Sequence, residues 1–210
     1  MPLLHGTITF SRFRVEAQQE IPKDVKKWLQ RGLTAKKFEP IDLKGEEDRA
    51  AGFVELEDSD QTEFSAGALF AQDYALFAFK VQQLRIPGSI LREEVDKWSK
   101  AFEKEKKRPP NRPEKAEARE NAKKSLRSRV IPSVKVYDVS WSLKGSALQI
   151  WASSKKQVEE IQTVLEDQLK LKLVPLRVGS GKITDVESLR PTPELFGEEV
   201  AGLEVNHGNA

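Results

Sequence analysis

The sequence predicts an α+β protein with largely antiparallel sheets and a projecting basic helical hairpin. Three observations lead to this prediction. Strand-like and helix-like segments follow the order β-α-β-β-β-α-α-β-β-α-β, which lacks the regular alternation of a parallel α/β sheet. Two neighbouring helical segments are rich in Lys and Arg and are separated by "RPPNRP". Directly after them come two strands joined by a short turn, the pattern of a β-hairpin.

The N-terminal part predicts a strand followed by a helix. "TITFSRFRVEA" (7–17) is rich in β-branched and aromatic residues, and the phase slip between Phe10 and Phe13 predicts a bulge. "IPKDVKKWLQRGL" (21–33) predicts a short amphipathic helix with Gly32 near its end. The apolar residues on its predicted inner face are Ile21, Val25, Trp28 and Leu29.

Strands are predicted next. "AGFVELE" (51–57) is a short strand, and the polar segment after it indicates a loop. "DYALFAFKVQQLRIP" (73–87) is a long strand that we expect to pair with "GALFA" (67–71) before it. Pro87 and Gly88 end this strand, because neither residue suits a strand interior.

The first helix of the predicted basic hairpin is "SILREEVDKWSKAFEKEKK" (89–107), with Ser89 as its expected N-cap. At 100° per residue its apolar side chains cover an arc of about 60°, and four lysines fall on the opposite side. One face should therefore pack while the other carries ammonium groups. The apolar residues are Leu91, Val95, Trp98 and Phe102, and the lysines are Lys97, Lys100, Lys104 and Lys107.

Proline ends this helix, since it lacks an N–H and clashes with the preceding turn. A second helix, roughly 114–129, has a weak apolar face and four cations at four-residue spacing. These cations are Lys115, Arg119, Lys123 and Arg127. The two helices together form the predicted hairpin, 89–129, with Arg108 and Arg112 at its tip.

The remaining chain predicts a β-hairpin, a helix and a final strand. Tyr137, Val139 and Trp141 alternate with polar residues before a turn at Lys144 and Gly145. The helix over 154–169 should bury Val158, Ile161, Val164 or Leu165, and Leu169, and "KLKLVPLRV" (170–178) should be a strand. We expect residues 1–178 to form one α+β region and residues 179–210 an acidic, partly disordered tail.

The distribution of charge indicates the kind of partner. The whole chain carries a net charge of only +2, yet residues 97–129 contain thirteen Lys or Arg against five Glu, a local net of +8. Such a segregated basic surface suits a nucleic-acid backbone. A solvated helical pair with ordinary surface ion pairs is the alternative interpretation of the same residues. The candidate nucleic-acid-binding residues are Lys97, Lys100, Lys104, Lys107, Arg108, Arg112, Lys115, Arg119, Lys123 and Arg127.

The sequence gives little support for a catalytic or metal-binding site. The chain has no Cys and only two His, both near its termini. "VGSGKIT" fails as a phosphate-binding loop, because Leu176 stands where the first Gly belongs and Ile183 where Ser or Thr belongs. We therefore expect no enzyme, no catalytic residue, no cofactor and no metal, with a carboxylate-dependent nuclease as an open alternative. No signal peptide or membrane span is apparent, so we expect a cytoplasmic protein.

Several segments together resemble a known family. "LRIPGSILREEV" (84–95), the basic helical region, "VIPS" (130–133) and "IWASSKKQVEEIQTVLEDQLKLKLVPL" (150–176) occur in the order and spacing of the bacterial recombination-associated protein RdgC family. The opening strand with "SRF" and the later "AGFVE" fit more weakly. The resemblance covers residues 5–177.

The resemblance implies a non-enzymatic protein that binds double-stranded DNA with little sequence preference. Members of the family form ring-shaped homodimers with a basic central hole, and they restrain the recombinase by covering DNA. It therefore implies a nucleoid-associated homo-oligomer, a dimer in preference to other states, that acts indirectly against the recombinase and binds no membrane. The resemblance implies a DNA-binding role for the ten candidate cations as a group and not for each position, because the family shares basic character in this region more than fixed residues.

The sequence departs from the family at its C-terminal end. Family members continue well beyond the Val-Pro-Leu strand, whereas this sequence ends in an acidic segment. We expect part of the ring-closing surface to be missing, which leaves an open clamp, a ring of other stoichiometry or a monomer as alternatives. The function alternative to DNA binding is a protein-interaction module whose basic hairpin docks an acidic protein.

Overall fold

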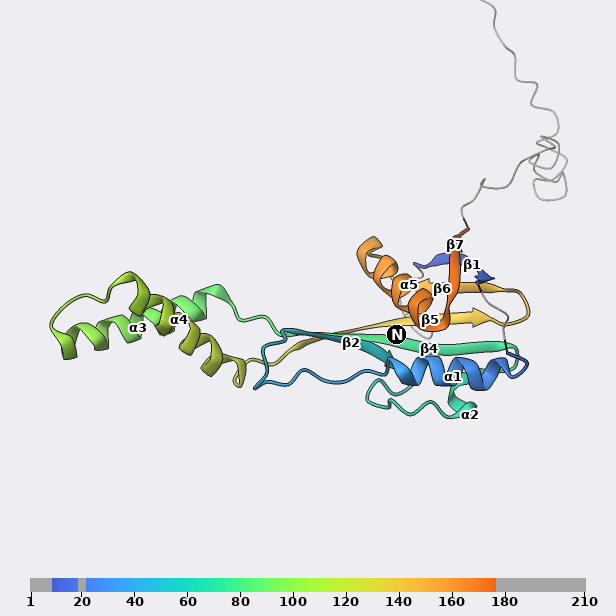
Figure 1. The fold of residues 1–210 in the computed structure, drawn as a ribbon, viewed down its shortest axis with the longest axis horizontal. Coiled ribbons are helices and arrows are strands. Elements are labelled where there is room, and N and C mark those ends of the chain that lie inside the picture. Colours follow the sequence, from blue (N-terminus) through green and yellow to red (C-terminus); the bar gives the residue numbers. More distant parts are fainter. Residues whose placement is uncertain (1–8, 19–21, 177–210) are drawn as a thin grey trace, which may run out of the picture. The chain divides into compact units, whose positions relative to one another are not determined.

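The computed structural model describes residues 9–18 and 22–176 of the chain (Figure 1). Contacts divide the chain into two units, Met1–Pro175 and Leu176–Ala210, and the elements below belong to the first. Helices and an antiparallel sheet make up this unit, which confirms the α+β class. The predicted acidic tail, 179–210, lies outside the described residues.

The described strands form one sheet of seven, in the order β2-β4-β5-β6-β1-β7, with β3 paired to β4 beside this path. Every pairing between these strands is antiparallel. The long ladder between β4 and β5 lies at the centre and runs without a break from Tyr74 opposite Ser142 to Gln83 opposite Ser133. The strands are β1 (Ser11–Ala17), β2 (Arg49–Val54), β3 (Phe70–Ala71), β4 (Tyr74–Gln83), β5 (Ser133–Ser142), β6 (Ala147–Trp151) and β7 (Leu171–Pro175).

The order of elements matches the prediction except for one short helix. α2 (Ala66–Leu69) forms just before β3, because the Ser65 hydroxyl accepts a hydrogen bond from the Ala68 N–H and caps a single turn. That turn takes up most of the predicted strand "GALFA", of which only two residues pair with β4. The other helices are α1 (Val25–Ala35), α3 (Gly88–Lys106), α4 (Arg112–Arg127) and α5 (Lys155–Leu169).

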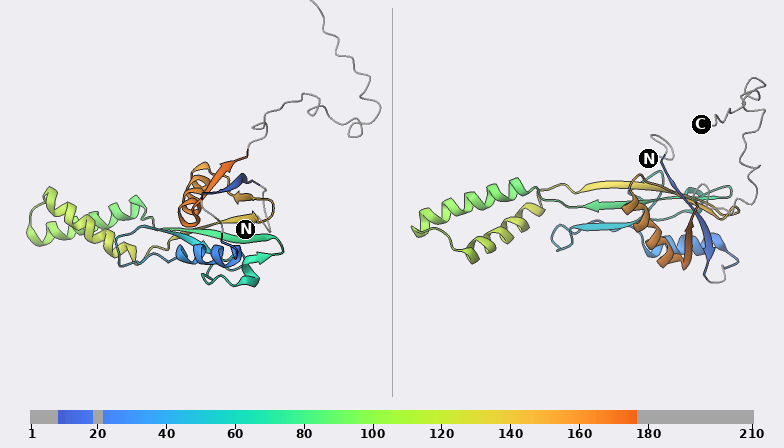
Figure 2. Two further views of the ribbon diagram at one scale, coloured as in Figure 1. Left: turned by 45° about the vertical axis from the view of Figure 1, so that its right-hand side comes forward. Right: turned by 90° about the horizontal axis from the view of Figure 1, so that it is seen from above.

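Helices α1 and α5 cover one face of the sheet with the main hydrophobic core between (Figure 2). Phe53, Phe77 and Phe79 contribute fully buried rings from β2 and β4. α5 buries Val158, Ile161, Leu165 and Leu169, which confirms its predicted inner face and places Leu165 there in preference to Val164. The core therefore fixes the helices against the β4–β5 ladder.

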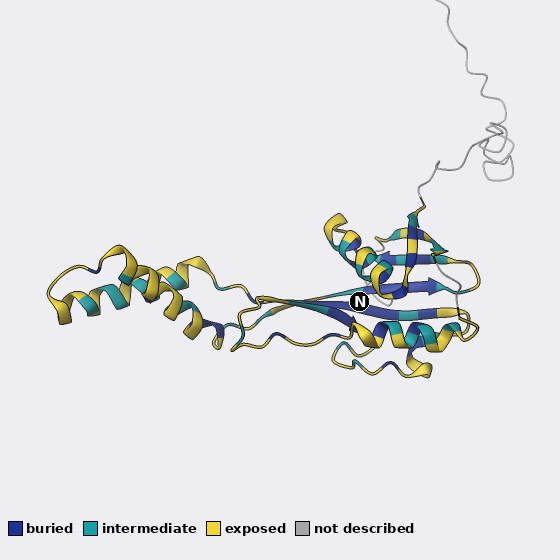
Figure 3. Ribbon diagram, viewed as in Figure 1, coloured by how far each residue is buried: buried dark blue, intermediate teal, exposed yellow. Residues whose placement is uncertain are grey.

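The opposite face has a smaller core. Phe38, Val54, Leu56 and Ala78 form it, with the loop segments before and after β2 as its cover. The buried Lys80 ammonium reaches the Asp60 carboxylate at 2.7 Å and the Ser59 carbonyl at 2.9 Å, so its charge is paired. Both faces are thus covered near the middle of β4 (Figure 3).

Two local predictions were wrong. β1 pairs in continuous register along its length, so the predicted bulge does not occur within it. Ser89 lies within the first turn of α3, whose N-cap is Pro87, without a side-chain cap. Gly32, predicted near the end of its helix, is the fourth residue from the end of α1 and lies at a close approach where an added Cβ would overlap Leu169 of α5. Of the remaining predicted positions in this part, Thr7, Ile8 and Ile21 lie outside the described residues.

Candidate nucleic-acid interface

α3 and α4 form an antiparallel pair inserted between β4 and β5, which we call the helical pair (88–127). α3 ends where Lys107 adopts a left-handed conformation, with φ of 54°, and donates its N–H to Glu103. α4 begins with a capping box, in which Asn111 and Glu114 each accept a backbone N–H from the other. The sequence "RPPNRP" therefore ends one helix and starts the next. Projection of this pair from the sheet stays a prediction.

A thin apolar seam holds the two helices together. The rings of Trp98 and Phe102 on α3 lie 5.1 Å apart, and Ala118 and Leu126 of α4 are buried. α3 has no buried residue at all, although its predicted apolar face is the less exposed one. Most of the surface of the helical pair is therefore open to solvent, as the colours in Figure 3 show.

Arg108 links the two helices at the turn. Its guanidinium donates two hydrogen bonds to the Glu114 carboxylate, at 2.6 and 2.9 Å, and lies 5.1 Å from the centre of the Phe102 ring. The Arg108 hydrogen bonds, and next the Asn111 backbone N–H, hold the pKa of Glu114 below its ordinary value. The same pair raises the pKa of Arg108. Arg108 is thus exposed but already engaged by a carboxylate.

Arg127 anchors the other end of α4. Its side chain is only 5% exposed, and it binds the Asp48 carboxylate and the backbone carbonyls of Glu47 and Leu43. The Asp48 carbonyl in turn accepts the Leu84 N–H just after β4. This cation ties α4 to the loop before β2, so it is inaccessible to a large ligand. Arg127 is therefore not part of the candidate interface.

The remaining candidates differ in how far other groups neutralise them. Lys97 pairs with Glu93 and Glu94, which raise its pKa, and Lys123 lies 3.8 Å from Asp48. Six others are exposed and take part in no ion pair within residues 9–18 and 22–176. These six, which we call the open cations, are Lys100, Lys104, Lys107, Arg112, Lys115 and Arg119.

Further exposed cations belong to the same region although the four-residue spacing did not select them, among them two near the end of α4. Lys124 and Arg129 have no ion-pair partner in the described part of the chain. Exposure of Arg129 follows from the end of α4 at Arg127, two residues before the predicted end. No signal in the sequence distinguishes Arg127 from these neighbours, because the spacing of cations along α4 does not show that Arg127 is buried against the loop before β2.

The described residues hold no group of three or more His, Cys, Asp or Glu arranged to bind a metal ion. Within the same residues, none of the helices combines the length and apolar character that crossing a membrane requires.

Comparison with known proteins gives one family match. The family described as "Putative exonuclease, RdgC" matches residues 10–184, which is most of the 210-residue chain. The match includes the helical pair, both of its connections to the sheet, and α5 with β7. A search among curated proteins found no match.

Proposed function

The chain belongs to the RdgC family, and from this premise we propose that it binds double-stranded DNA without sequence preference through the helical pair. Family membership indicates a recombination-related, DNA-associated role. In the proposal the protein acts as a homodimeric ring or clamp on nucleoid DNA and limits the access of the recombinase to that DNA. Binding requires no catalytic residue and no cofactor.

The observation that carries this proposal is the set of open cations. Six exposed side chains, without a carboxylate partner among residues 9–18 and 22–176, gather on two adjacent helices and the turn between them. The sixteen residues of α4 extend about 24 Å, a length over which one DNA strand presents about seven phosphates. Lys and Arg side chains directed at phosphates give affinity and register but carry no base information. Sequence-nonspecific binding follows from that chemistry.

The test measures binding by fluorescence anisotropy, with labelled random-sequence duplexes and single strands. Titrations at about 50, 100 and 200 mM salt span a range in which the screening of interactions between charges changes strongly. The variant K100Q/K104Q/K115Q/R119Q removes four of the open cations. We expect it to weaken binding of all duplexes alike, by about a thousandfold near 0.1 M salt if each cation neutralises one phosphate. The log–log salt slope should flatten by about four units.

A matched control separates these contacts from net charge. The variant K23Q/R31Q/K37Q/K172Q removes the same charge from exposed residues outside the helical pair. It should bind duplex DNA with a nearly unchanged salt slope. Equal weakening by both variants would show that the helical pair has no special role. Failure of the wild-type chain to bind duplex, together with tight binding to an acidic protein, would favour the protein-interaction alternative.

The family is described as a putative exonuclease, so nuclease activity is a second candidate. It predicts shortening of an end-labelled duplex when Mg²⁺ or Mn²⁺ is present. We propose that the chain is not an enzyme, and intact DNA after prolonged incubation with either ion is the expected result. Metal-dependent loss of terminal nucleotides that persists through purification would overturn this part of the proposal.

A further inference from the structure

A second cationic surface lies on the sheet, at the end of the β4–β5 ladder. On the face that α1 and α5 cover, strands β2, β4 and β5 align side chains in rows across the sheet. The innermost row belongs to the hydrophobic core, as do Val81 and, at its margin, Ala51 of the middle row, whereas Lys135 and the whole outermost row are polar. The rows, from the outside inwards, are Arg49, Gln83 and Ser133; Ala51, Val81 and Lys135; and Phe53, Phe79 and Tyr137.

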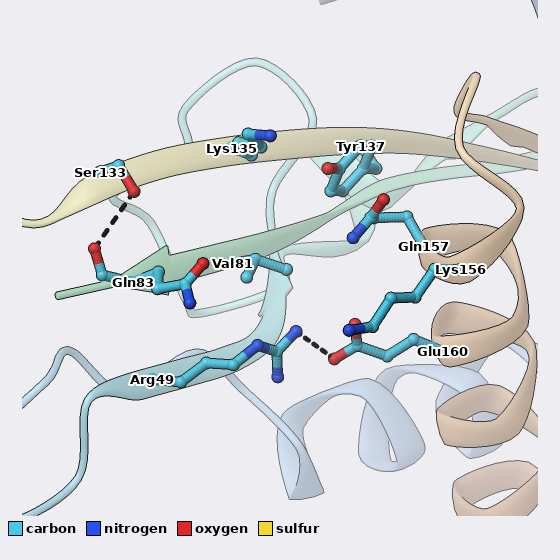
Figure 4. Close-up of a pocket in the computed structure, with 9 residues that line it drawn as sticks. All are labelled: Arg49, Val81, Gln83, Ser133, Lys135, Tyr137, Lys156, Gln157 and Glu160. Atoms are coloured by element: carbon cyan, nitrogen blue, oxygen red, sulfur yellow. Dashed lines mark hydrogen bonds and ion pairs between the residues drawn. The ribbon is translucent and has the colours of Figure 1, made fainter. Parts of the chain in front are cut away.

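α5 stops short of the two outer rows. Its first turns contribute Lys156, Gln157 and Glu160 to a groove whose floor is the sheet (Figure 4). The groove has a volume of about 460 Å³, within the range typical of small-ligand sites. Side chains on this face would be apolar if a helix covered them, but here amide, hydroxyl and cationic groups surround an open space. We call this space the sheet groove.

Positive charge exceeds negative charge in the sheet groove. Arg49 forms an ion pair with Glu160, which leaves Lys135 and Lys156 without a partner in the described part of the chain. Burial, and then the nearby Glu160 carboxylate, raise the pKa of Tyr137. The phenol therefore keeps its proton and is able to donate a hydrogen bond. Two ammonium groups and neutral donors around one cavity are the groups that bind a phosphate.

The sheet groove directly adjoins the helical pair along the chain. Gln83 and Ser133 form the last pair of the ladder, and the Ser133 hydroxyl donates a hydrogen bond to the Gln83 carbonyl at 3.1 Å. The exposed cation Arg129 lies four positions before Ser133 in the chain, a span of at most about 14 Å. A duplex carries a charge about every 1.7 Å of its axis, so a stretch of DNA as long as this span presents about eight phosphates.

We propose that the sheet groove binds a phosphate group through Lys135 and Lys156, as an additional contact for a nucleic-acid backbone. The inference deepens the proposed function and rests on it for the source of the phosphate. Internal phosphodiesters of a duplex and the phosphate of a free nucleotide share the same chemistry, so the experiment must distinguish them.

The experiment measures duplex affinity and phosphate binding separately. For the first, K135Q/K156Q should weaken binding to an unphosphorylated blunt duplex about fiftyfold near 0.1 M salt, since each lost contact removes about 0.9 from the salt slope. For the second, a titration with inorganic phosphate, and another with a deoxynucleoside monophosphate, should shift the NMR signals of Lys135, Tyr137 and Lys156 in the full chain.

Two variants serve as controls. K23Q/K172Q removes the same charge from exposed residues outside the groove and should bind duplex like the wild type. K135R/K156R keeps the charge and should restore most of the affinity that K135Q/K156Q loses. Thermal unfolding of each variant checks that the fold is intact.

The outcomes separate this inference from the proposed function. If K135Q/K156Q binds duplex as tightly as K23Q/K172Q and phosphate shifts no groove signal, the inference is wrong while duplex binding by the helical pair stands. If the wild type binds no duplex but phosphate or the nucleotide shifts the groove signals, the groove is a small-ligand site and the proposed function fails. If neither probe binds, both proposals are wrong. Weakened duplex binding with rescue by K135R/K156R supports both.

Discussion

Arg127 shows that a cation in a basic helix is able to serve the fold and not a ligand. It shares the four-residue spacing of Lys115, Arg119 and Lys123, so the sequence alone placed it with them. The structure buries it against Asp48, a residue in a distant part of the chain. Periodicity along one helix gives no information about such a partner, and for this reason the sequence could not distinguish the two roles.

Arg127→Met should destabilise the protein by about 2 kcal/mol, because hydrogen bonds that involve charged groups typically contribute about 1.5–3 kcal/mol. Part of the loss is offset since Asp48 stays about half exposed and regains water. Arg129→Met, at an exposed cation without an ion pair in the described residues, should change stability by less than about 0.5 kcal/mol. Urea unfolding measures both values. Equal effects of the two substitutions would refute the anchoring role of Arg127.

The Glu114 carboxyl should make stability at the turn of the helical pair depend on pH. Its pKa is lowered from 4.5 by Arg108 and Asn111, so the folded state binds this proton more weakly than the unfolded state. The stabilisation is therefore complete above about pH 4.5 and is lost as pH falls through the lowered pKa. Carboxyl NMR titration should find Glu114 below 4.5 in the wild type and higher in Arg108→Gln. An ordinary pKa in both proteins would contradict the structure.

At the level of elements, the periodicity of apolar residues predicted which faces of helices and strands are buried in the core. The inner face of α5 and the row of Tyr137, Val139 and Trp141 on β5 followed directly from the spacing of the large apolar residues, although the residues between them on β5 are buried as well. The one-turn helix α2 was missed, because four residues are too few for any periodicity and its cap comes from a single Ser65 hydroxyl. The sheet groove was missed as well. It requires the register of three strands, and the sequence does not specify which residues face one another across them.

The sequence also did not predict where two backbone segments approach each other closely. Gly52 of β2 lies at such a position and allows the approach to be tested. A Cβ at this position in β2 would lie 2.5–2.6 Å from backbone atoms of Lys37 and Phe38, which cannot rotate away. Gly52→Ala should therefore cost about 2–3 kcal/mol, as overpacking typically does. Gly67→Ala in α2 is the control, since its Cβ meets nothing within 4 Å and alanine favours a helix. Urea unfolding of the two variants should give opposite signs, and similar destabilisation by both would argue against the close approach.

For the whole molecule, the net charge matters less for binding than the positions of the cations that no carboxylate compensates. The net charge of +2 gives no hint of a polyanion partner, because acidic residues elsewhere cancel the cations. Of the ten candidate cations, Lys97, Arg108, Lys123 and Arg127 form ion pairs in the structure, and the six open cations are those that remain. The sequence alone selected ten candidate cations. The ion pairs in the structure show that fewer of them carry a charge that no carboxylate compensates, and these should contribute most to phosphate binding.

The salt dependence of duplex binding measures how many of these cations contact phosphates. Each neutralised phosphate releases counterions and contributes about −0.9 to the log–log slope, so six open cations predict a slope of about −5. Affinity should then fall roughly a thousandfold between 50 and 200 mM salt, equally for duplexes of any sequence. If Lys135 and Lys156 of the sheet groove also contact phosphates, the slope should approach about −7, and K135Q/K156Q should return it to about −5. Anisotropy titrations at several salt concentrations provide the slopes. A slope near zero would mean that the open cations meet solvent alone, and a wild-type slope that K135Q/K156Q leaves unchanged would confine DNA to the helical pair.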